Sequence, residues 1–498
     1  MRAALPLAGV FALAAALRFY ALGFGLPYPN ARPDETTAVG HAAAILTGDP
    51  NPHFFNWPSL TLYVFAAALG AAKTIGIALT DGQPILIARF VVALAGSLTV
   101  LAAAAIGRSI SGLITAVVAA LFLAVAPLHV RESHFAMTDV LMTLLVTLSL
   151  AFMMRASDTR RRGLFAAAGA AGGLATSTKY SAGVVLAIVL AAPGVTTAAI
   201  YAAAWTAGFL AGTPFSALDP SAFLRDVSYE RSHLSGGHTV ALARGWVSHL
   251  HTTLPRGLGI GVFVAAVCGA LLLAVRYRRR ALVPLIFALA FYVAIGAGRT
   301  VFFRYALPLV PVACVFAAVA VVSAAEWLGV RTKLPVAAIA ATLAIVVAAS
   351  SFRQSLQLDR MLAREDSRVV AADWLRERLR PEHTLHDSGG DYSRLSLPGV
   401  AFHEWRYDPA ARSFGGPAGA TPDWIVLYES PLPEYTSAPE TLRDLVRQRY
   451  ALELRVDGVP GQAEDGIYDR QDAFFLPIDG FRRVARPGPT VLIYRRRT

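Results

Sequence analysis

Residues 85–106 read ILIARFVVALAGSLTVLAAAAI, and after a short polar turn residues 112–128 read GLITAVVAALFLAVAPL. As a helix with about 1.5 Å of rise per residue, the first run spans about 33 Å. That length is enough to cross the roughly 30 Å hydrocarbon core of a bilayer. Two such runs joined by only five residues predict a pair of neighbouring transmembrane helices.

Similar apolar runs recur along the chain as far as residue 351. They lie near 5–25, 138–154, 163–178, 180–194, 196–213, 256–275, 281–298, 305–325 and 335–351. Of the 498 residues, 55% are hydrophobic and only 16% are charged, whereas a soluble domain carries about 25% charged residues. The expected fold class is therefore a polytopic α-helical membrane protein with about eleven transmembrane helices. This class excludes nucleic-acid binding as the explanation of the net charge of +12.

Clusters of basic residues predict the orientation of these helices. Arg155 with 160–162, Arg276 with 278–280, and Arg331 with Lys333 are the clusters, and by the positive-inside rule they mark cytoplasmic loops. Alternating crossings then place the remaining loops outside the membrane, together with everything after residue 351. The outer loops are 26–84, 129–137, 214–255 and 299–304.

One further apolar stretch, 58–79, is predicted to lie along the outer membrane surface. It contains Lys73 and several glycines. If Asp34 and Asp139 are both outside, an even number of crossings separates them, yet three apolar stretches lie between. The stretch at 58–79 is the weakest of the three, so it is predicted not to cross.

The charge balance divides the chain into two predicted domains. Residues 1–351 hold 24 basic and 11 acidic residues, whereas residues 352–498 hold 21 basic and 22 acidic residues. The first range is predicted to be a transmembrane catalytic domain and the second an extracytoplasmic α/β domain. Helices are expected at Ser367–Leu379 and, behind a capping box at 437–440, through Arg449. Strands are expected at Trp424–Tyr428, Leu452–Val456 and Val491–Tyr494.

The residues suited to chemistry collect on the outer side. The acids are Asp34, Glu35 and Asp139, and the other candidates are Lys179, Arg299, Arg304, Tyr305, His53 and His134. An acid at a membrane surface can deprotonate an acceptor hydroxyl. Nearby cations can neutralise a departing phosphate, and a phosphate carried on a lipid would arrive at this depth.

Each candidate also has a simpler interpretation. Asp34 could be a solvated loop acid, and Asp139 could cap the helix that begins beside it. Lys179, Arg299 and Arg304 could extend their charged ends to lipid headgroups. His53 and His134 with the carboxylates could bind a divalent metal, but they lack the tight spacing of metal ligands.

An ordered series of short motifs resembles a known family. The series is Asp34-Glu35, His53 with Trp57-Pro58-Ser59-Leu60, Gly107-Arg108, His134 through Asp139, Thr178-Lys179-Tyr180, Arg304 through Pro308, and Arg486 through Pro489. It is similar to the bacterial relatives of dolichyl-phosphate-mannose protein mannosyltransferases, which belong to the GT-C superfamily of polytopic glycosyltransferases. Lipid A aminoarabinose transferases are more distant members. The resemblance covers nearly the whole membrane domain.

The resemblance implies roles for three groups of residues. Asp34 would be the catalytic base, with Glu35 adjacent, and Asp139 would support the acceptor or the base. The donor would be a polyprenyl monophosphate sugar, with inversion at the anomeric carbon. Lys179, Arg299, Arg304 and Tyr305 would bind the leaving phosphate, while His53 and His134 would support the acceptor or the loops. Because the leaving group is a monophosphate, no metal is strictly required. The lumenal β-trefoil insert of the eukaryotic enzymes does not occur in this sequence, so a protein acceptor is not implied.

The resulting hypothesis is a multi-pass glycosyltransferase of the bacterial inner membrane with an extracytoplasmic active site. Its partners would be a polyprenyl-phosphate sugar, membrane lipid, and a glycan, lipid or protein acceptor whose identity the sequence does not reveal. Two other classes remain open. One is a transporter or lipid flippase with an outer sensor domain, which should show charges at mid-membrane. The other is a non-catalytic assembly factor, for which Asp34 would be dispensable.

Overall fold

The computed structural model describes residues 4–417, 419–459, 461 and 465–497. Within them it leaves out the side chains of 4, 233–235, 278 and 279, so the side chains of two arginines of the second predicted cytoplasmic cluster are not described. The chain forms two compact units. The helical unit comprises Met1–Leu22 and Thr37–Leu356, and the mixed unit comprises Gly23–Thr36 and Gln357–Thr498.

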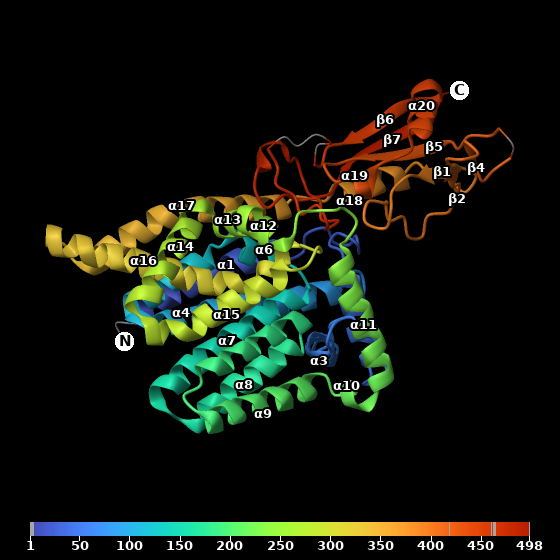
Figure 1. Cartoon of the computed structure of the whole chain (residues 1–498). Helices are drawn as coiled ribbons and strands as arrows, with labels where there is room; N and C mark the ends of the chain where they lie inside the picture. Colours follow the sequence, from blue (N-terminus) through green and yellow to red (C-terminus); the bar gives the residue numbers. More distant parts are fainter. Residues whose placement is uncertain (1–3, 418, 460, 462–464, 498) are drawn as a thin grey trace. The chain divides into compact units, whose positions relative to one another are not determined.

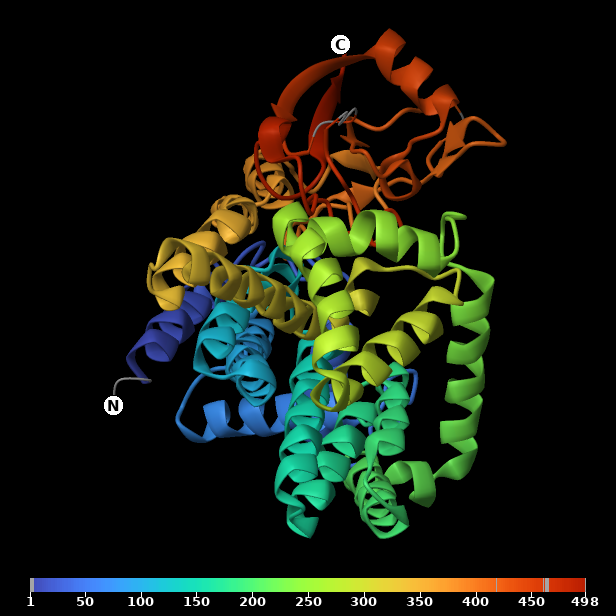
Figure 2. The same cartoon turned by 60° about the vertical axis from the view of Figure 1, so that its left-hand side comes forward.

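The helical unit is a bundle of helices (Figures 1 and 2). Its elements, of which α2 begins and α17 ends in the mixed unit, are in chain order α1 (Ala4–Phe19), α2 (Glu35–Ile45), α3 (Leu60–Thr74), α4 (Gln83–Ser111), α5 (Leu113–Ala124), α6 (Pro127–Glu132), α7 (Thr138–Thr159), α8 (Arg162–Thr176), η1 (Tyr180–Ala191), α9 (Val195–Gly212), α10 (Phe215–Leu218), α11 (Pro220–Gly236), α12 (Gly245–Ser248), η2 (His249–Thr253), α13 (Leu254–Leu258), α14 (Ile260–Arg276), α15 (Arg278–Gly296), η3 (Phe303–Ala306), α16 (Leu309–Thr332) and α17 (Val336–Leu362).

Five of these helices are long and apolar enough to cross a membrane, or six if one bent pair counts as a single span, among the residues that the structure describes. The bent pair joins Gly245–Leu258 to Ile260–Arg276 at 115°. The predicted total of eleven spans also needs shorter helices, such as α1, α5 and the 3₁₀ helix η1. The multi-pass class is therefore supported, whereas the number eleven stays a prediction.

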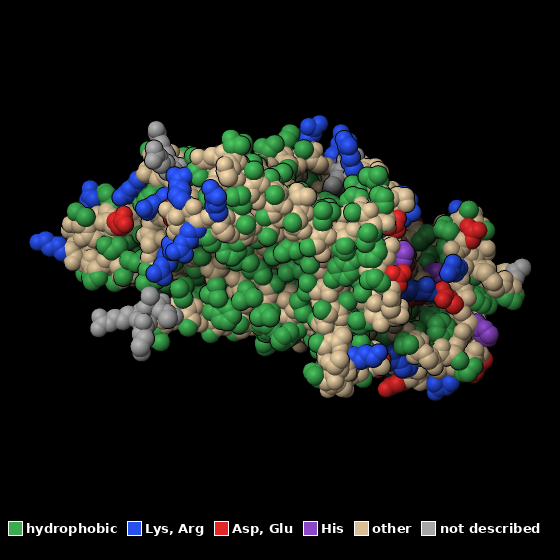
Figure 3. Space-filling model, turned by 90° about the horizontal axis from the view of Figure 1, so that it is seen from below, with side chains coloured by type: hydrophobic (Ala, Val, Ile, Leu, Met, Phe, Trp, Pro, Cys, Tyr) green, Lys and Arg blue, Asp and Glu red, His purple; other side chains and the backbone are tan. Residues whose placement is uncertain are grey.

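Side chains on the outside of the bundle fit a lipid environment. Leu271 and Val275 of α14 and Leu289 of α15 are each more than 60% exposed. Figure 3 shows a broad area of hydrophobic side chains on one face, with a group of Lys and Arg side chains along one end of it. A monomeric soluble protein rarely exposes a contiguous apolar area of this kind.

Two glycines of α8 allow its backbone to pack directly against that of α9. A Cβ atom on Gly173 would lie 1.9 Å from the carbonyl oxygen of Trp205, and one on Gly169 would lie 2.2 Å from that of Tyr201. Small residues four apart on one helix face let two membrane helices approach until their backbones touch. Neither glycine could be replaced without separating the two helices.

The mixed unit is built around a five-stranded sheet in the order β2-β1-β5-β7-β6. β1 pairs in parallel with β2 and β5, whereas β7 pairs antiparallel with β5 and β6. Its elements are α18 (Ser367–Arg376), β1 (Thr384–Asp387), β2 (His403–Glu404), β3 (Tyr407–Asp408), β4 (Ser413–Phe414), β5 (Trp424–Glu429), α19 (Pro433–Thr436), α20 (Glu440–Arg449), β6 (Tyr450–Val456), η4 (Phe481–Arg483) and β7 (Thr490–Arg496).

Apolar side chains on the two faces of the sheet form separate cores. Val426 and Ile493 on one face pack against Leu375 of α18. Ile425 and Leu492 on the other face belong to the core cluster that includes Leu442 of α20. The alternation of side chains along β5 therefore places a helix on each face of the sheet.

The predicted helix ending at Arg449 is present, but its predicted start is wrong. α20 begins at Glu440, its N-cap is Pro439, and no side chain caps it. Ser437, the expected cap, instead follows α19 in an extended conformation. Proline at 439 fixes an extended entry to the helix and takes the position that the serine would need.

Candidate active site

An ion pair joins two of the predicted site residues within the helical unit. Lys179 Nζ donates to Asp139 Oδ1 at 2.6 Å. The two side chains are only 17% and 1% exposed. Asp139 is the second residue of α7, and Lys179 directly precedes η1, so residues 40 positions apart meet at the ends of two helices.

This geometry decides between the interpretations that the sequence left open for these two residues. The N-cap of α7 is Met137, and no side chain caps the helix, so Asp139 is not the predicted cap. As a carboxylate in the first turn it still benefits from the helix dipole. Lys179 is paired inside the unit and does not extend to the surface.

Tyr305 and Arg304 complete the cluster around Lys179. Its Nζ lies 4.4 Å from the ring centroid of Tyr305, and the guanidinium of Arg304 lies 4.0 Å from that of Phe302. Arg304 is 6% exposed. Burial lowers the pKa of Lys179, Asp139 opposes that shift, and the positive charge of Arg304 adds to it. Glu230 also opposes that shift, so this part of the helical unit combines two cations with two carboxylates.

The segment before α3 in the helical unit is tied to the same place. Leu60 N donates to Ser177 O at 2.9 Å, just before Lys179. The hydroxyl of Tyr180 donates to Phe55 O at 2.7 Å, and Phe55 N donates to Asp226 Oδ2 at 2.9 Å. The loop before α3, the turn before η1 and the helix α11 thus meet around Lys179.

The remaining predicted residues of the helical unit do not join this ion pair. Arg299 is exposed in the connection between α15 and η3. His53 is exposed and pairs with Asp49 at 2.9 Å. His134 is fully buried, and its ring nitrogens lie 2.9 Å from the carbonyl oxygens of Val130 and Tyr20, a geometry that favours a structural role.

Asp34 and Glu35 belong to the mixed unit and differ sharply in environment. Asp34 is partly exposed and has φ +69°, a left-handed conformation that a non-glycine residue rarely adopts. Strained backbone of this kind is frequent at functional sites. Glu35 is the first residue of α2 and is fully buried. Only Asp34 therefore presents a carboxylate that an acceptor could reach.

The segment that carries Asp34 is held by the C-terminal part of the chain. Arg32 Nη1 pairs with Asp472 Oδ1 at 2.7 Å, and both side chains are buried. The Arg32 guanidinium also lies 5.5 Å from the ring centroid of Phe474. Asn30 Nδ2 donates to Asp391 O at 2.9 Å. Sequence reasoning missed Arg32 and Asp472, because no local pattern links residues 440 positions apart.

No group of three or more His, Cys, Asp or Glu side chains that could hold a metal ion occurs among the described residues. The two predicted histidines have separate partners, as described above. The cluster that the structure does assemble contains the cations Lys179 and Arg304, the ring of Tyr305 and the carboxylate of Asp139, and Glu230 also acts on Lys179. Its two cations can donate charge-assisted hydrogen bonds to an oxyanion.

Comparison with known proteins gives one family match and several matches of fold. Residues 68–215 match the family model described as dolichyl-phosphate-mannose-protein mannosyltransferase. The crystal structure of ArnT from Cupriavidus metallidurans in the apo state is 17% identical, covers 98% of this chain and 97% of its own, and has a TM-score of 0.56. Its complex with undecaprenyl phosphate gives 0.55 at the same identity and coverage.

A second solved structure has part of the same fold. The oligosaccharyltransferase of Archaeoglobus fulgidus in the apo form is 16% identical, with a TM-score of 0.52. The match covers 75% of this chain but only 58% of the archaeal one. The comparison with curated protein sequences gives no match. The family match over residues 68–215 and the fold shared with ArnT agree with the resemblance that the motifs indicated.

Proposed function

We propose that the protein transfers a sugar from a polyprenyl-phosphate donor to an acceptor hydroxyl on the extracytoplasmic side of the bacterial inner membrane. The observation that carries the proposal is the buried Lys179–Asp139 pair beside Arg304 and Tyr305, in a chain whose fold resembles ArnT. Support for the donor class comes from the ArnT structure solved with undecaprenyl phosphate.

In the proposed reaction the acceptor oxygen attacks the anomeric carbon while the bond from that carbon to the phosphate oxygen breaks. Asp34 takes the proton from the acceptor hydroxyl, and lipid monophosphate leaves. Attack from the face opposite the phosphate inverts the anomeric centre. Lys179 and Arg304 bind the charge that builds on the leaving phosphate, with Arg299 as a weaker, exposed cation.

Asp139 has a positioning role in this proposal. Its carboxylate holds the Lys179 ammonium at 2.6 Å, which keeps a buried lysine charged in a place where burial opposes the charge. The phosphate of the donor would share that ammonium. Two cations suffice for a monophosphate leaving group, so the proposed mechanism needs no metal ion.

Removing the phosphate-binding cations should impair use of the donor. We expect Lys179→Gln and Arg304→Gln each to lower kcat/KM for the lipid-linked sugar about 10- to 100-fold, because a hydrogen bond to a charged group contributes roughly 1.5–3 kcal/mol. Arg299→Gln should have a smaller effect, since Arg299 is exposed. The measurement is release of polyprenyl phosphate from a labelled donor by the purified protein.

A matched double variant separates catalysis from folding in that experiment. Lys179→Gln alone leaves Asp139 buried without its cation, which is destabilising. Lys179→Gln combined with Asp139→Asn removes both charges and should regain stability without regaining activity. Full donor use by the double variant would contradict the assignment of Lys179 to phosphate binding.

The orientation of the chain is a separate expectation. Reporter fusions after residues 158 and 279 should report the cytoplasm, and fusions after 236 and 400 should report the outside, because the basic clusters flank the first two positions. Paired reporters that are active only on opposite sides of the membrane would test this. A cytoplasmic signal after residue 400 would overturn the placement of Asp34 and of the mixed unit.

A further inference from the structure

The mixed unit contains a cavity of about 350 Å³ at one edge of its sheet. Ser388 follows β1 directly, and α19 follows β5, so both walls begin at the carboxyl ends of neighbouring parallel strands. From β1 the chain runs to β2, the strand at one edge of the sheet, whereas from β5 it runs to β6, the strand at the opposite edge. Such a switch point is where open α/β sheets bind ligands.

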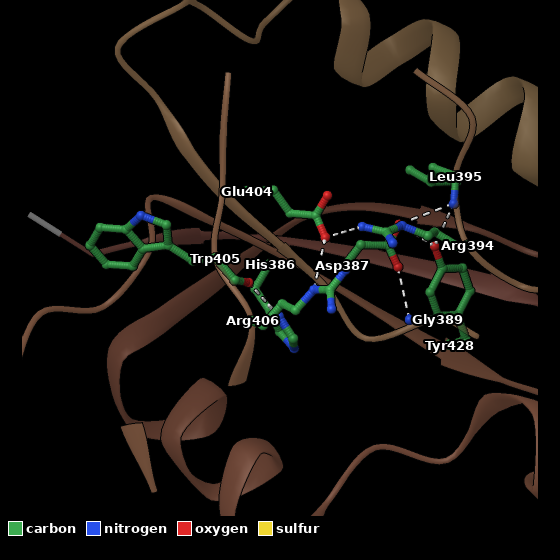
Figure 4. A network of polar contacts seen from close by, with 9 residues as sticks. All are labelled: His386, Asp387, Gly389, Arg394, Leu395, Glu404, Trp405, Arg406 and Tyr428. Atoms are coloured by element: carbon green, nitrogen blue, oxygen red, sulfur yellow. Dashed lines mark hydrogen bonds and ion pairs between the residues drawn. The ribbon is translucent and has the colours of Figure 1, made fainter. Parts of the chain in front are cut away.

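The wall that follows β1 is held by a buried carboxylate (Figure 4). Asp387 accepts hydrogen bonds from Gly389 N at 2.8 Å, from Leu395 N at 3.0 Å and from the hydroxyl of Tyr428 at 2.9 Å. Burial raises the pKa of Asp387 to about 6, although these three donors lower it. The loop from 388 to 395 is therefore anchored at both ends.

A second set of bonds ties that loop to the opposite wall. Gly390 N donates to Ser393 Oγ at 3.0 Å, and Ser393 Oγ donates to the carbonyl oxygen of Tyr435 at 2.8 Å. Gly389 leaves no room for a side chain, since a Cβ there would lie 2.7 Å from the backbone of Arg394. The cavity is thus formed before any ligand arrives, which limits the entropy cost of binding.

Hydroxyls, carboxylates and aromatic rings line the cavity. The polar and aromatic residues among its described lining are Ser388, Asp391, Tyr392, Glu434, Tyr435, Thr436 and Ser437. The rings of Tyr392 and Tyr435 stand edge to face with centroids 6.4 Å apart. The buried Ser388 Oγ has no hydrogen-bond partner among the described residues.

This lining selects a class of ligand. Carboxylates and hydroxyls accept and donate to the hydroxyl groups of a polyol, and tyrosine rings provide flat apolar surface with a polar end. No Lys or Arg is among the described lining residues, so a phosphate would be repelled. Glu434 already pairs with Arg470 at 3.3 Å, which makes a neutral sugar a better fit than a cation.

The cavity is close to the segment that carries the proposed base. Asn30, four residues before Asp34, donates to the carbonyl oxygen of the lining residue Asp391. The negative charge of Asp34 adds to burial in raising the pKa of the lining residue Tyr392. A molecule bound here would sit beside the carboxylate that the proposed function assigns to proton removal.

We propose that this cavity is an acceptor subsite that binds a neutral, polyhydroxylated sugar, so that the acceptor is a glycan or a glycosylated molecule. The inference rests on the proposed function only where it calls the bound sugar an acceptor. The binding itself does not depend on transfer. Asp391 and the free hydroxyl of Ser388 would contact the sugar hydroxyls, and Tyr392 would cover one face of the ring.

Saturation-transfer NMR on the full-length protein would test the binding. The probes are the methyl glycosides of glucose, galactose, mannose and arabinose, and the detergent must have no sugar headgroup. We expect at least one glycoside to bind the unaltered protein. Asp391→Asn, which removes the carboxylate charge, and Tyr392→Leu, which removes the aromatic ring, should each weaken that binding at least fivefold.

Controls make each outcome decisive. Glu440→Gln alters an exposed acid of the same unit that pairs with Arg447 and should leave glycoside binding unchanged. Three outcomes would each overturn the proposal. They are binding of none of the four glycosides, binding of ethylammonium but no glycoside, and glycoside binding by both cavity variants as strong as that of the unaltered protein. Polyprenyl phosphate release by the unaltered protein and by Glu440→Gln in the same preparations tests the proposed function separately, because glycoside binding does not require transfer.

Discussion

Asp34→Asn is expected to lower sugar transfer by about 10²–10⁴-fold while leaving the protein folded, because the amide keeps the size of the side chain but cannot take a proton. Asp34 is partly exposed, so the substitution removes no packed contact of a core residue. Its backbone at φ +69° tolerates asparagine, which is also enriched in the left-handed region. Transfer should be measured at saturating donor, with donor binding measured separately.

The other two predicted acids, Glu35 and Asp139, serve as controls for that experiment. Glu35 is buried at the start of α2, so Glu35→Gln should reduce stability more than it reduces turnover per folded molecule. Asp139→Asn should be intermediate, because it weakens the hold on Lys179 without removing the base. Near-normal turnover of Asp34→Asn, together with loss in Glu35→Gln or Asp139→Asn, would assign the base to a different acid.

Asp472→Ala is expected to destabilise the mixed unit by about 3–5 kcal/mol, the usual cost of removing one partner of a buried ion pair. The charge left behind is Arg32, whose side chain is 0% exposed. Arg32 lies two residues before Asp34, so the loss should also displace the proposed base and abolish transfer. Thermal unfolding of the full chain, with proteolysis of the segment before Asp34, would measure both effects.

A surface acid and a paired replacement complete the design. Asp457 pairs with Arg455 in exposed positions, so Asp457→Ala should cost less than about 1 kcal/mol. Arg32→Met with Asp472→Leu replaces both charges by apolar side chains of similar size and should recover much of the stability. If Asp472→Ala proved as stable as Asp457→Ala, the pair would not be what holds the Asp34 segment.

Local pattern accounts for the parts of the fold that were predicted from the residues. Runs such as 85–106 form helices because a long apolar stretch in a membrane must satisfy its own backbone hydrogen bonds. Strands near Trp424–Tyr428 and Val491–Tyr494 were predicted within two residues of their observed ends, since β-branched and aromatic residues favour a buried sheet. The start of α20 was missed, because the capping pattern includes a proline that takes the cap position.

The sequence by itself determined the membrane class, most helix and strand positions, and a short list of charged residues suited to phosphate and proton chemistry. Only the tertiary structure decided which of them meet: Lys179 with Asp139, and Arg32 with Asp472. The same holds for the grouping of residues 23–36 with the C-terminal unit and for the cavity at the carboxyl ends of β1 and β5. Helix and strand formation depends on neighbours a few residues apart, whereas a buried charge is stable only beside a partner that the fold supplies from far along the chain.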